Sequence, residues 1–163
     1  MFKKNSNIKI GIVCSHGGHL DDVLSIFEAF KGYKVFLVSY DVTTLRNFQY
    51  PGIEKFYYIK YFGDYFIGIF LNLLLSCFAY IRIFIKERPQ VIFSTGSELA
   101  IPAFYIGKFL FHSKLIFLEQ FTRAHTATIT ARCVYCISDL FLVQRESLLS
   151  EFGKKAKYAG SIL

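Results

Sequence analysis

The stretch IKIGIVCSHGGHL, residues 8–20, decides the fold class. It opens with a short, almost wholly apolar run, Ile8 to Val13, of the kind that forms a buried strand. Gly17 and Gly18 then end the strand, and apolar residues recur every three or four positions from Leu20 to Phe30, which is helical spacing. A buried strand that turns through glycines into a helix indicates a parallel α/β sheet.

Short apolar runs and helical segments go on alternating along the rest of the chain. Further strands are expected at residues 34–38, 54–60, 91–93, 114–118, 139–143 and 158–160, and helices at 41–48, 65–85, 98–111, 126–137 and 146–152. This alternation predicts a single doubly wound, Rossmann-like parallel sheet over residues 1–163, with a 3-2-1-4-5 strand order. Ligands of such sheets bind beyond the carboxyl ends of the strands.

The composition narrows the class of protein. The 163 residues are 53% hydrophobic and 18% aromatic, which excludes a disordered or low-complexity chain. The formal net charge of +7 favours anionic partners. Because the basic residues are scattered and form no run or helix face, nucleic acid is the weaker interpretation and an anionic membrane surface the stronger. No secretory signal is recognisable at residues 1–7, so we expect a cytoplasmic location.

The segment 65–85 is the most apolar of the chain. Its seventeen residues between Asp64 and Arg82 carry no formal charge, and as a helix they would measure about 26 Å. A true membrane span would separate the earlier strands from the later ones, so we favour a crossover helix that also enters a membrane interface. A helix buried in the core or in a protein interface is the other alternative.

Two sets of residues define this segment further. A narrow stripe of polar or small residues runs along it and leaves the rest of its surface apolar: Asn72, Ser76, Ala79, Arg82 and Lys86. The residues that we predict to contact the membrane are Phe66, Phe70, Leu74, Phe78 and Arg82.

The four cysteines are expected to be reduced thiols in the cytoplasm. Cys133 and Cys136 form a C-x-x-C pattern inside a helical segment, whereas a redox pair would start a helix after a strand. A zinc site would need two further ligands at suitable spacing, and only the isolated His125 lies nearby. We therefore interpret the pair as two small core residues one turn apart, and we expect neither a metal ion nor a cofactor.

The first strand ends in the loop that holds the strongest candidate residues. Paired glycines at a strand-to-helix turn let backbone amides approach an anion, so Ser15, His16, Gly17 and Gly18 are candidates for ligand binding. The loop lacks the G-x-G-x-x-G spacing of nicotinamide sites. His19 stands at the start of the helix, where the helix dipole favours a neutral imidazole that could act as a base. The alternative is that His16 and His19 only cap the turn.

Two later strands end in similar loops. Thr95, Gly96, Ser97 and Glu98 form a small, hydroxyl-rich turn that could hold a phosphate or sugar hydroxyl, or could simply cap a helix. After the fifth strand, the carboxylate of Glu119 is suited to a sugar hydroxyl and the guanidinium of Arg123 to a phosphate, with Gln120 between them. Glu119 and Arg123 could instead pair with each other.

Four motifs in chain order carry a resemblance to a known family. They are residues 15–20, 89–98, 118–123 and 138–144, and together they resemble the asparagine-linked-glycosylation-fourteen-like family, which includes the PssD-type proteins of bacterial exopolysaccharide and capsule synthesis. Each motif alone is weak, but four in register are specific. The resemblance spans nearly the whole chain, from Ile8 to Gly160.

The resemblance implies the acceptor-side, amino-terminal half of a GT-B glycosyltransferase. The other half would be a separate chain with the nucleotide-sugar site, and the pair would transfer a sugar from a UDP-sugar to a polyprenyl-diphosphate-linked saccharide. The fused relative, the N-acetylglucosaminyltransferase of peptidoglycan lipid intermediates, has a similar Gly-Gly-His turn, matching Gly17 to His19, and a Glu-Gln pair, matching Glu119 and Gln120. Its histidine is a candidate base toward the acceptor hydroxyl.

This chain departs from the family at some positions, and the resemblance also implies a partner chain. Cys14 and Ser15 replace glycines of the fused relative's turn, and the membrane helix of the eukaryotic members is absent, which moves attachment at the cytoplasmic face onto residues 65–85. Since a full GT-B enzyme needs about twice this length, we expect a heterodimer that is inactive without its second chain. Partner contact is predicted at Tyr158, Gly160, Ile162 and Leu163. The alternative function is a non-catalytic membrane scaffold that only recruits and stabilises the catalytic chain.

Overall fold

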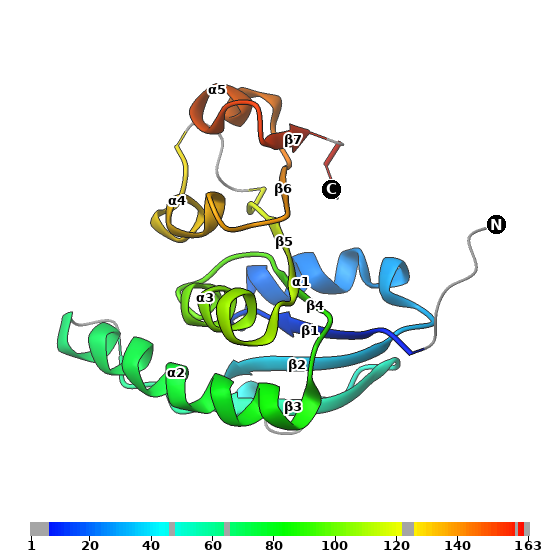
Figure 1. Ribbon diagram of the computed structural model, residues 1–163, viewed down its shortest axis with the longest axis vertical. Helices are drawn as coiled ribbons and strands as arrows, with labels where there is room; N and C mark the ends of the chain where they lie inside the picture. Colours follow the sequence, from blue (N-terminus) through cyan, green and yellow to red (C-terminus); the bar gives the residue numbers. More distant parts are fainter. Residues whose placement is uncertain (1–6, 46–47, 64–65, 122–125, 159, 162–163) are drawn as a thin grey trace.

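The computed structural model describes residues 7–45, 48–63, 66–121, 126–158 and 160–161 (Figure 1). Its centre is a sheet of seven parallel strands in the order β3-β2-β1-β4-β5-β6-β7, which confirms the predicted fold class and strand order. The strands are β1 Lys9–Val13, β2 Lys34–Tyr40, β3 Ile53–Ile59, β4 Val91–Ser94, β5 Lys114–Leu118, β6 Leu140–Val143 and β7 Ala156–Tyr158.

The helices connect successive strands and differ from the expected ones mainly at their ends. They are α1 Gly18–Ser25, α2 Phe66–Glu87, α3 Ala100–Phe111, α4 Ile129–Tyr135 and α5 Leu149–Phe152, with 3-10 turns η1 Phe27–Phe30, η2 Thr43–Leu45 and η3 Glu146–Leu148. Helix α3 starts two residues late because Gly96 and Ser97 have left-handed backbones. Helix α4 starts at Ile129 because Thr128 caps it, its side chain accepting a hydrogen bond from Ala131 N.

Helices cover both faces of the sheet. On one face, α2, α3, α4 and α5 bury a core that includes Tyr80, Phe104, Phe117 and Phe141. On the other face, α1 and η1 pack on β1, β2 and β4 through Leu20, Val23, Phe27 and Phe30. Burial of both faces explains why the central strands β1, β2 and β4 are nearly continuous apolar runs in the sequence.

Helices α2 and α3 lie side by side on their face of the sheet (Figure 1). Gly107 lets α3 approach β4 closely, since a Cβ at this position would lie only 2.1 Å from Ile92 Cδ1. A larger residue there would require the Ile92 side chain or the helix to shift. Helix α3 is therefore fixed against the strand whose end carries Thr95.

Helix α2 has an inverted polarity. Asn72 and Ser76, which belong to the polar stripe seen in the sequence, are buried, whereas Phe70 and Phe78 are 61% and 65% exposed. The buried amide of Asn72 accepts a hydrogen bond from Phe62 N and donates to Gly63 O. These two backbone groups lie just before the helix and need partners. Asn72 of the polar stripe thus holds the preceding loop, whereas Arg82 and Lys86 of the same stripe face water.

The described part of the chain contains no helix with the length and the apolar character needed to cross a bilayer.

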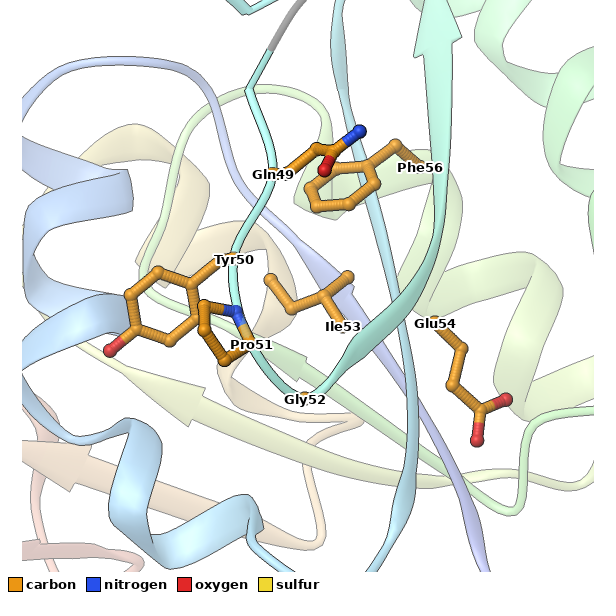
Figure 2. Close-up of a pocket in the computed structure, with 7 residues that line it drawn as sticks. All are labelled: Gln49, Tyr50, Pro51, Gly52, Ile53, Glu54 and Phe56. Atoms are coloured by element: carbon orange, nitrogen blue, oxygen red, sulfur yellow. The ribbon is translucent and has the colours of Figure 1, made fainter.

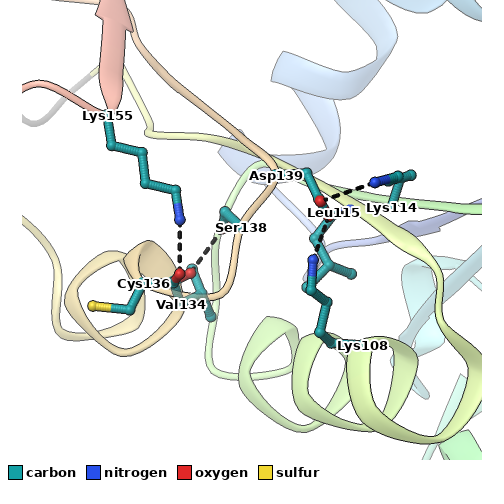
Figure 3. A network of polar contacts seen from close by, with 8 residues as sticks. All are labelled: Lys108, Lys114, Leu115, Val134, Cys136, Ser138, Asp139 and Lys155. Carbon is teal, nitrogen blue, oxygen red and sulfur yellow. Dashed lines mark hydrogen bonds and ion pairs between the residues drawn. The ribbon is translucent and has the colours of Figure 1, made fainter.

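Acidic side chains at the amino edge of the sheet are saturated with partners. Glu87, at the end of α2, accepts hydrogen bonds from Lys9 Nζ and Lys55 Nζ, each at 2.9 Å, and from the hydroxyl of Tyr57. Figure 3 shows a similar junction, where Lys108 of α3 and Lys114 of β5 converge on Asp139 at 2.9 and 3.4 Å. These contacts tie the helices to the strand starts.

The interpretation of Cys133 and Cys136 as core residues is wrong, because both are exposed. Helix α4 buries Ala131 and Val134, three residues apart, so positions 133 and 136 fall on its outward face. The sequence pattern was ambiguous because this helix is only seven residues long.

Candidate active site

The loops at the carboxyl ends of β1, β4 and β5 converge at the point where the strand order reverses. Strand β1 leads through α1 to β2, and β4 leads through α3 to β5, so their loops diverge and leave a crevice between them. An open pocket of about 420 Å³ lies here. Its lining comes from all three loops: His19, Ser97, Glu98, Gln120, Ala127, Thr128, Ile129 and Thr130. The structure therefore brings together predicted residues from three distant segments.

His19 and Thr95 fix each other across the crevice. The ring Nδ1 of His19 lies 2.9 Å from Thr95 O, and the Thr95 hydroxyl donates to His19 O at 2.7 Å. Because a carbonyl oxygen only accepts, Nδ1 carries the proton in this contact and the lone pair of the neutral ring is on Nε2. His19 does more than cap the turn, since its ring contacts the next loop.

The turn after β4 is strained and holds a hydroxyl without a partner. Gly96 has φ 123° and Ser97 φ 71°, a left-handed backbone that is uncommon outside glycine. A Cβ at Gly96 would lie 2.7 Å from His19 Cε1, so only glycine leaves room for the imidazole. The buried Ser97 Oγ has no hydrogen-bond partner among the described residues. Strain and an unpaired polar atom in a pocket wall are typical of a ligand site.

Glu98 and Tyr40 form the side of the pocket next to β2. The Tyr40 hydroxyl donates to Glu98 Oε1 at 2.7 Å. Tyr40 is the last residue of β2, and it is buried. This contact orients the Glu98 carboxylate from a strand end that the sequence did not single out.

Glu119 and Gln120 have different positions. Glu119 is 1% exposed, and its carboxylate accepts hydrogen bonds from Thr128 Oγ1 at 3.2 and 3.1 Å. Thr128 in turn caps α4 and lines the pocket, so Glu119 reaches the pocket through Thr128, whereas Gln120 lines it directly. A role for Glu119 in binding an acceptor stays a prediction.

The glycine turn after β1 lies open at the start of α1. His16, Gly17 and Gly18 are exposed, and Gly17 has φ 76°. A Cβ at Gly18 would lie 2.8 Å from Gln120 Nε2, so the glycine allows the first and third loops to touch. Ser15 is partly buried beside them. The approach of an anionic group to this exposed turn stays a prediction.

Two residues near the site were missed in the sequence. Asp22 lies three residues after His19 on α1, and burial, with the nearby charge of Asp21, raises its pKa to about 6. Its Oδ2 is buried with no hydrogen-bond partner in the described part of the chain. Gln144, after β6, donates to Glu119 O at 3.2 Å. Helical spacing from His19 could have indicated Asp22, but the contact of Gln144 depends on tertiary structure.

Some predicted residues fall outside what the structure describes. Arg123, Ile162 and Leu163 lie outside the described residues, and the side chain of Phe66 is likewise not described. Tyr158 ends β7 and is exposed, and Gly160 lines a groove of about 240 Å³ beside Ile26 and Leu142. Partner contact at this end of the chain stays a prediction.

Another pocket, of about 640 Å³, lies elsewhere (Figure 2). It surrounds the turn at Pro51 and Gly52 that leads into β3, at the opposite edge of the sheet from His19. Its carboxylate, Glu54, points away from the ring of Tyr50 (Figure 2). None of the predicted site residues lies there. The described residues also contain no group of His, Cys, Asp or Glu side chains arranged for a metal ion.

Comparison with known proteins finds a matching family and a similar protein. The profile of a family described as "Oligosaccharide biosynthesis protein Alg14 like" matches residues 53–162. The UDP-N-acetylglucosamine transferase subunit ALG14 of Candida albicans is 31% identical over 80 residues, which are 45% of this chain and 36% of that protein. The chain thus matches well under two thirds of this relative's length.

Solved structures show the same fold at low identity. The MurG of Acinetobacter baumannii superposes with a TM-score of 0.74 at 13% identity, covering 94% of this chain and 45% of MurG. The UDP-GlcNAc 2-epimerase of Methanocaldococcus jannaschii gives a TM-score of 0.71 at 14% identity, covering 94% of this chain and 46% of the epimerase. This chain corresponds to about half of each of these structures.

Proposed function

The chain belongs to the Alg14-like family of oligosaccharide biosynthesis proteins, and we propose from this that it is the acceptor-side subunit of a two-chain glycosyltransferase. The pair would transfer a sugar, N-acetylglucosamine in the first instance, from a UDP-sugar to a polyprenyl-diphosphate-linked saccharide. The proposed setting is the cytoplasmic face of a membrane. The likeness of the chain to about half of MurG supports a division of the enzyme into an acceptor half and a donor half.

The observation that carries the proposal is the geometry of His19. Its Nδ1 donates to Thr95 O, so the neutral ring has its basic lone pair on Nε2, and the side chain lines the pocket at the switch point. A general base must hold this tautomer before the substrate arrives. The bond from the Thr95 hydroxyl to the backbone oxygen of His19 holds the two loops together, and the Nδ1 contact orients the ring without a ligand.

The reaction follows from this geometry. The acceptor hydroxyl oxygen attacks the anomeric carbon of the donor sugar, and the bond from this carbon to the diphosphate oxygen breaks. UDP leaves with the electron pair, and the hydroxyl proton passes to His19 Nε2. Ser97 Oγ and the Glu98 carboxylate would hold acceptor hydroxyl groups, while Arg123 and the amides at Gly17 and Gly18 would approach the acceptor diphosphate.

Membrane attachment is proposed through α2. Phe70, Leu74 and Phe78 repeat every four residues on its exposed face, and Arg82 continues the same row. Apolar burial and attraction of a cation to anionic lipid add to each other at such a surface. The partner chain would meet the carboxyl-terminal segment that includes Tyr158 and Gly160.

The test uses the full chain co-expressed with its partner, which we expect the neighbouring reading frame to encode. His19→Ala should reduce transfer by about 100- to 10,000-fold, the usual contribution of a general base. Co-purification with the partner and binding to anionic vesicles should stay unchanged. The control is His112→Ala, an exposed histidine at the opposite edge of the sheet.

Other outcomes separate the alternatives. Full transfer by the His19→Ala pair would support a scaffold that only recruits the catalytic chain. Normal transfer by the purified single chain would overturn the two-chain proposal. Deletion of residues 161–163 should abolish co-purification, and retention of full affinity would move the partner surface away from this segment.

A further inference from the structure

An apolar groove runs between α2 and α3 on the outer surface of the molecule. It encloses about 340 Å³, a size typical of small-molecule sites. Its floor is made by Leu73 and Cys77 of α2 with Ile101 and Pro102 of α3. Its rim consists of Phe70, Leu74 and Tyr105, which are exposed by 61%, 45% and 43%. So much apolar surface facing water marks a binding surface.

The groove lies beside the first turn of α3, a few residues after the part of the chain that lines the polar pocket. Helices α2 and α3 both follow strands of the parallel sheet, so both amino ends lie at the carboxyl edge. Ile101 follows Glu98 by three residues, and Ile101 N donates to Glu98 O at 3.1 Å. Ser97 and Glu98 line the pocket of His19. A ligand with a polar head in the pocket could therefore continue directly into the groove.

Helix α2 carries exposed cations beyond the groove, toward the amino edge of the sheet, where they suit the head groups of a surrounding anionic bilayer. Arg82 is exposed in the same row of α2 as Phe70, Leu74 and Phe78, and Lys86 follows one turn later. A protein segment would bring backbone amides and carbonyls that need hydrogen bonds. The floor residues offer apolar side chains, which suit a hydrocarbon chain that needs none.

We propose that the α2–α3 groove binds the isoprenoid chain of the lipid-linked acceptor, beside the diphosphate held at the pocket of His19. This inference rests on the proposed function and adds a place for the part of the acceptor next to the reacting sugar. Binding of the chain would lift its first units out of the bilayer and orient the acceptor hydroxyl toward His19, which is a contribution of positioning.

The experiment exploits the absence of tryptophan from the chain. Tyr105→Trp places a single fluorophore on the rim, and the probe is geranylgeranyl diphosphate without detergent. We expect a saturable blue shift with this probe and none with inorganic diphosphate. The matched control is Phe109→Trp, one turn further along α3 at an exposed position outside the groove lining. Equal responses from both reporters would overturn the proposal.

A second variant fills the groove. Cys77→Phe, or Ile101→Phe if the first variant does not fold, should weaken binding of the probe by about tenfold, because an apolar side chain then occupies the space of the lipid. Vesicle binding should persist, since Phe70, Leu74 and Phe78 are unchanged. Unaltered binding of the probe by a folded variant would show that the groove is not the site. The proposal would also be wrong if the tryptophan reporter gave a blue shift that rises with protein concentration in the absence of lipid, because the groove would then bind a second copy of the chain.

The two proposals fail in different ways. If the filled variant, paired with its partner chain, keeps a normal Michaelis constant for the lipid-linked acceptor, the groove is wrong and the subunit function stands. If the His19→Ala pair is fully active while the reporter still responds to geranylgeranyl diphosphate, the groove stands as a lipid site and the catalytic role of His19 is wrong.

Discussion

The two edges of the sheet differ in how completely their polar side chains are paired. At the amino edge, Glu87 has three hydrogen-bond donors and Asp139 accepts from Lys108, Lys114 and the Leu115 amide. At the carboxyl edge, Ser97 Oγ is buried with no hydrogen-bond partner among the residues described, and its backbone is left-handed. Both edges belong to the same strands, so the difference does not arise from the fold alone.

The contrast teaches where stability and function reside. A saturated network stabilises the folded state, because each buried charge has its partners. An unpaired hydroxyl on a strained turn costs stability and is retained where a ligand supplies the missing partner. The amino edge is therefore expected to govern folding, and the carboxyl edge to govern binding and turnover.

The largest effect is expected from breaking the network of Glu87. Glu87→Leu leaves Lys9 and the Tyr57 hydroxyl facing an apolar side chain, and the free energy of unfolding should fall by about 3–4 kcal/mol. Urea denaturation measures this change. The transfer rate per folded molecule of the reconstituted pair should stay the same, and a loss of that rate would contradict the separation of the two edges.

Lowering the pH should remove nearly the same stabilisation by Glu87 without a mutation. Burial alone would raise the pKa of Glu87, but hydrogen bonds from Tyr57, Lys55 and Lys9 outweigh it and lower the pKa from 4.5 to about 2. A lowered pKa stabilises the fold above pH 4.5, and this stabilisation is lost as the pH falls toward 2, by an amount on the order of 3 kcal/mol.

The comparison variant for acid is Glu87→Gln. Its unfolding free energy should depend less on pH between 4.5 and 2 than that of the unmodified chain, as followed by circular dichroism at several urea concentrations. Parallel pH curves for the two proteins would show that Glu87 is not the group responsible.

A smaller effect is expected at the carboxyl edge from Glu119→Gln. The carboxylate holds Thr128, which lines the pocket, so the acceptor's apparent Michaelis constant should rise by about tenfold. The Michaelis constant for the UDP-sugar should change little. An equal rise for both substrates, measured in the reconstituted pair, would count against a role on the acceptor side.

The smallest effects are expected from substituting two residues with a left-handed backbone, one at each edge of the sheet. Ser97→Gly and His112→Gly both relieve a positive φ, of 71° and 55°, and each should raise the unfolding free energy by about 0.5–1 kcal/mol. Only Ser97→Gly should lower acceptor turnover, because it also removes a hydroxyl from the pocket. Thermal denaturation and transfer assays on both variants would show whether strain serves function at one edge alone.

Much of this fold could be predicted from the sequence, because the spacing of apolar residues along the chain reflects which side chains are buried. The strand runs that include β1 and β4 are largely buried, and both are almost wholly apolar. Helix α2 shows the limit of such patterns. Its polar stripe looks like a solvent face, but Asn72 is used to satisfy a preceding loop, and that need is invisible until the tertiary contacts are known.

The general location of the candidate site could also be predicted from the sequence. The switch-point rule placed the loops of His19 and Thr95 together, since both follow strands that are neighbours in the sheet. It could not show which side chains face the pocket. Glu119 turns under Thr128 and Gln144 supports its backbone, contacts between residues nine and 25 positions apart. Such contacts depend on loop conformation, which has no periodic signal.

The close approach at Gly107 has a consequence for association with a partner. Because α3 is seated directly on Ile92, the turn at Ser97 and Glu98 has little freedom to lose when a second chain or an acceptor arrives. The entropic cost of ordering a loop is then already met during folding. In hydrogen exchange, the amides of β4 and α3 should therefore be among the slowest of the chain, and complex formation should hardly change their rates.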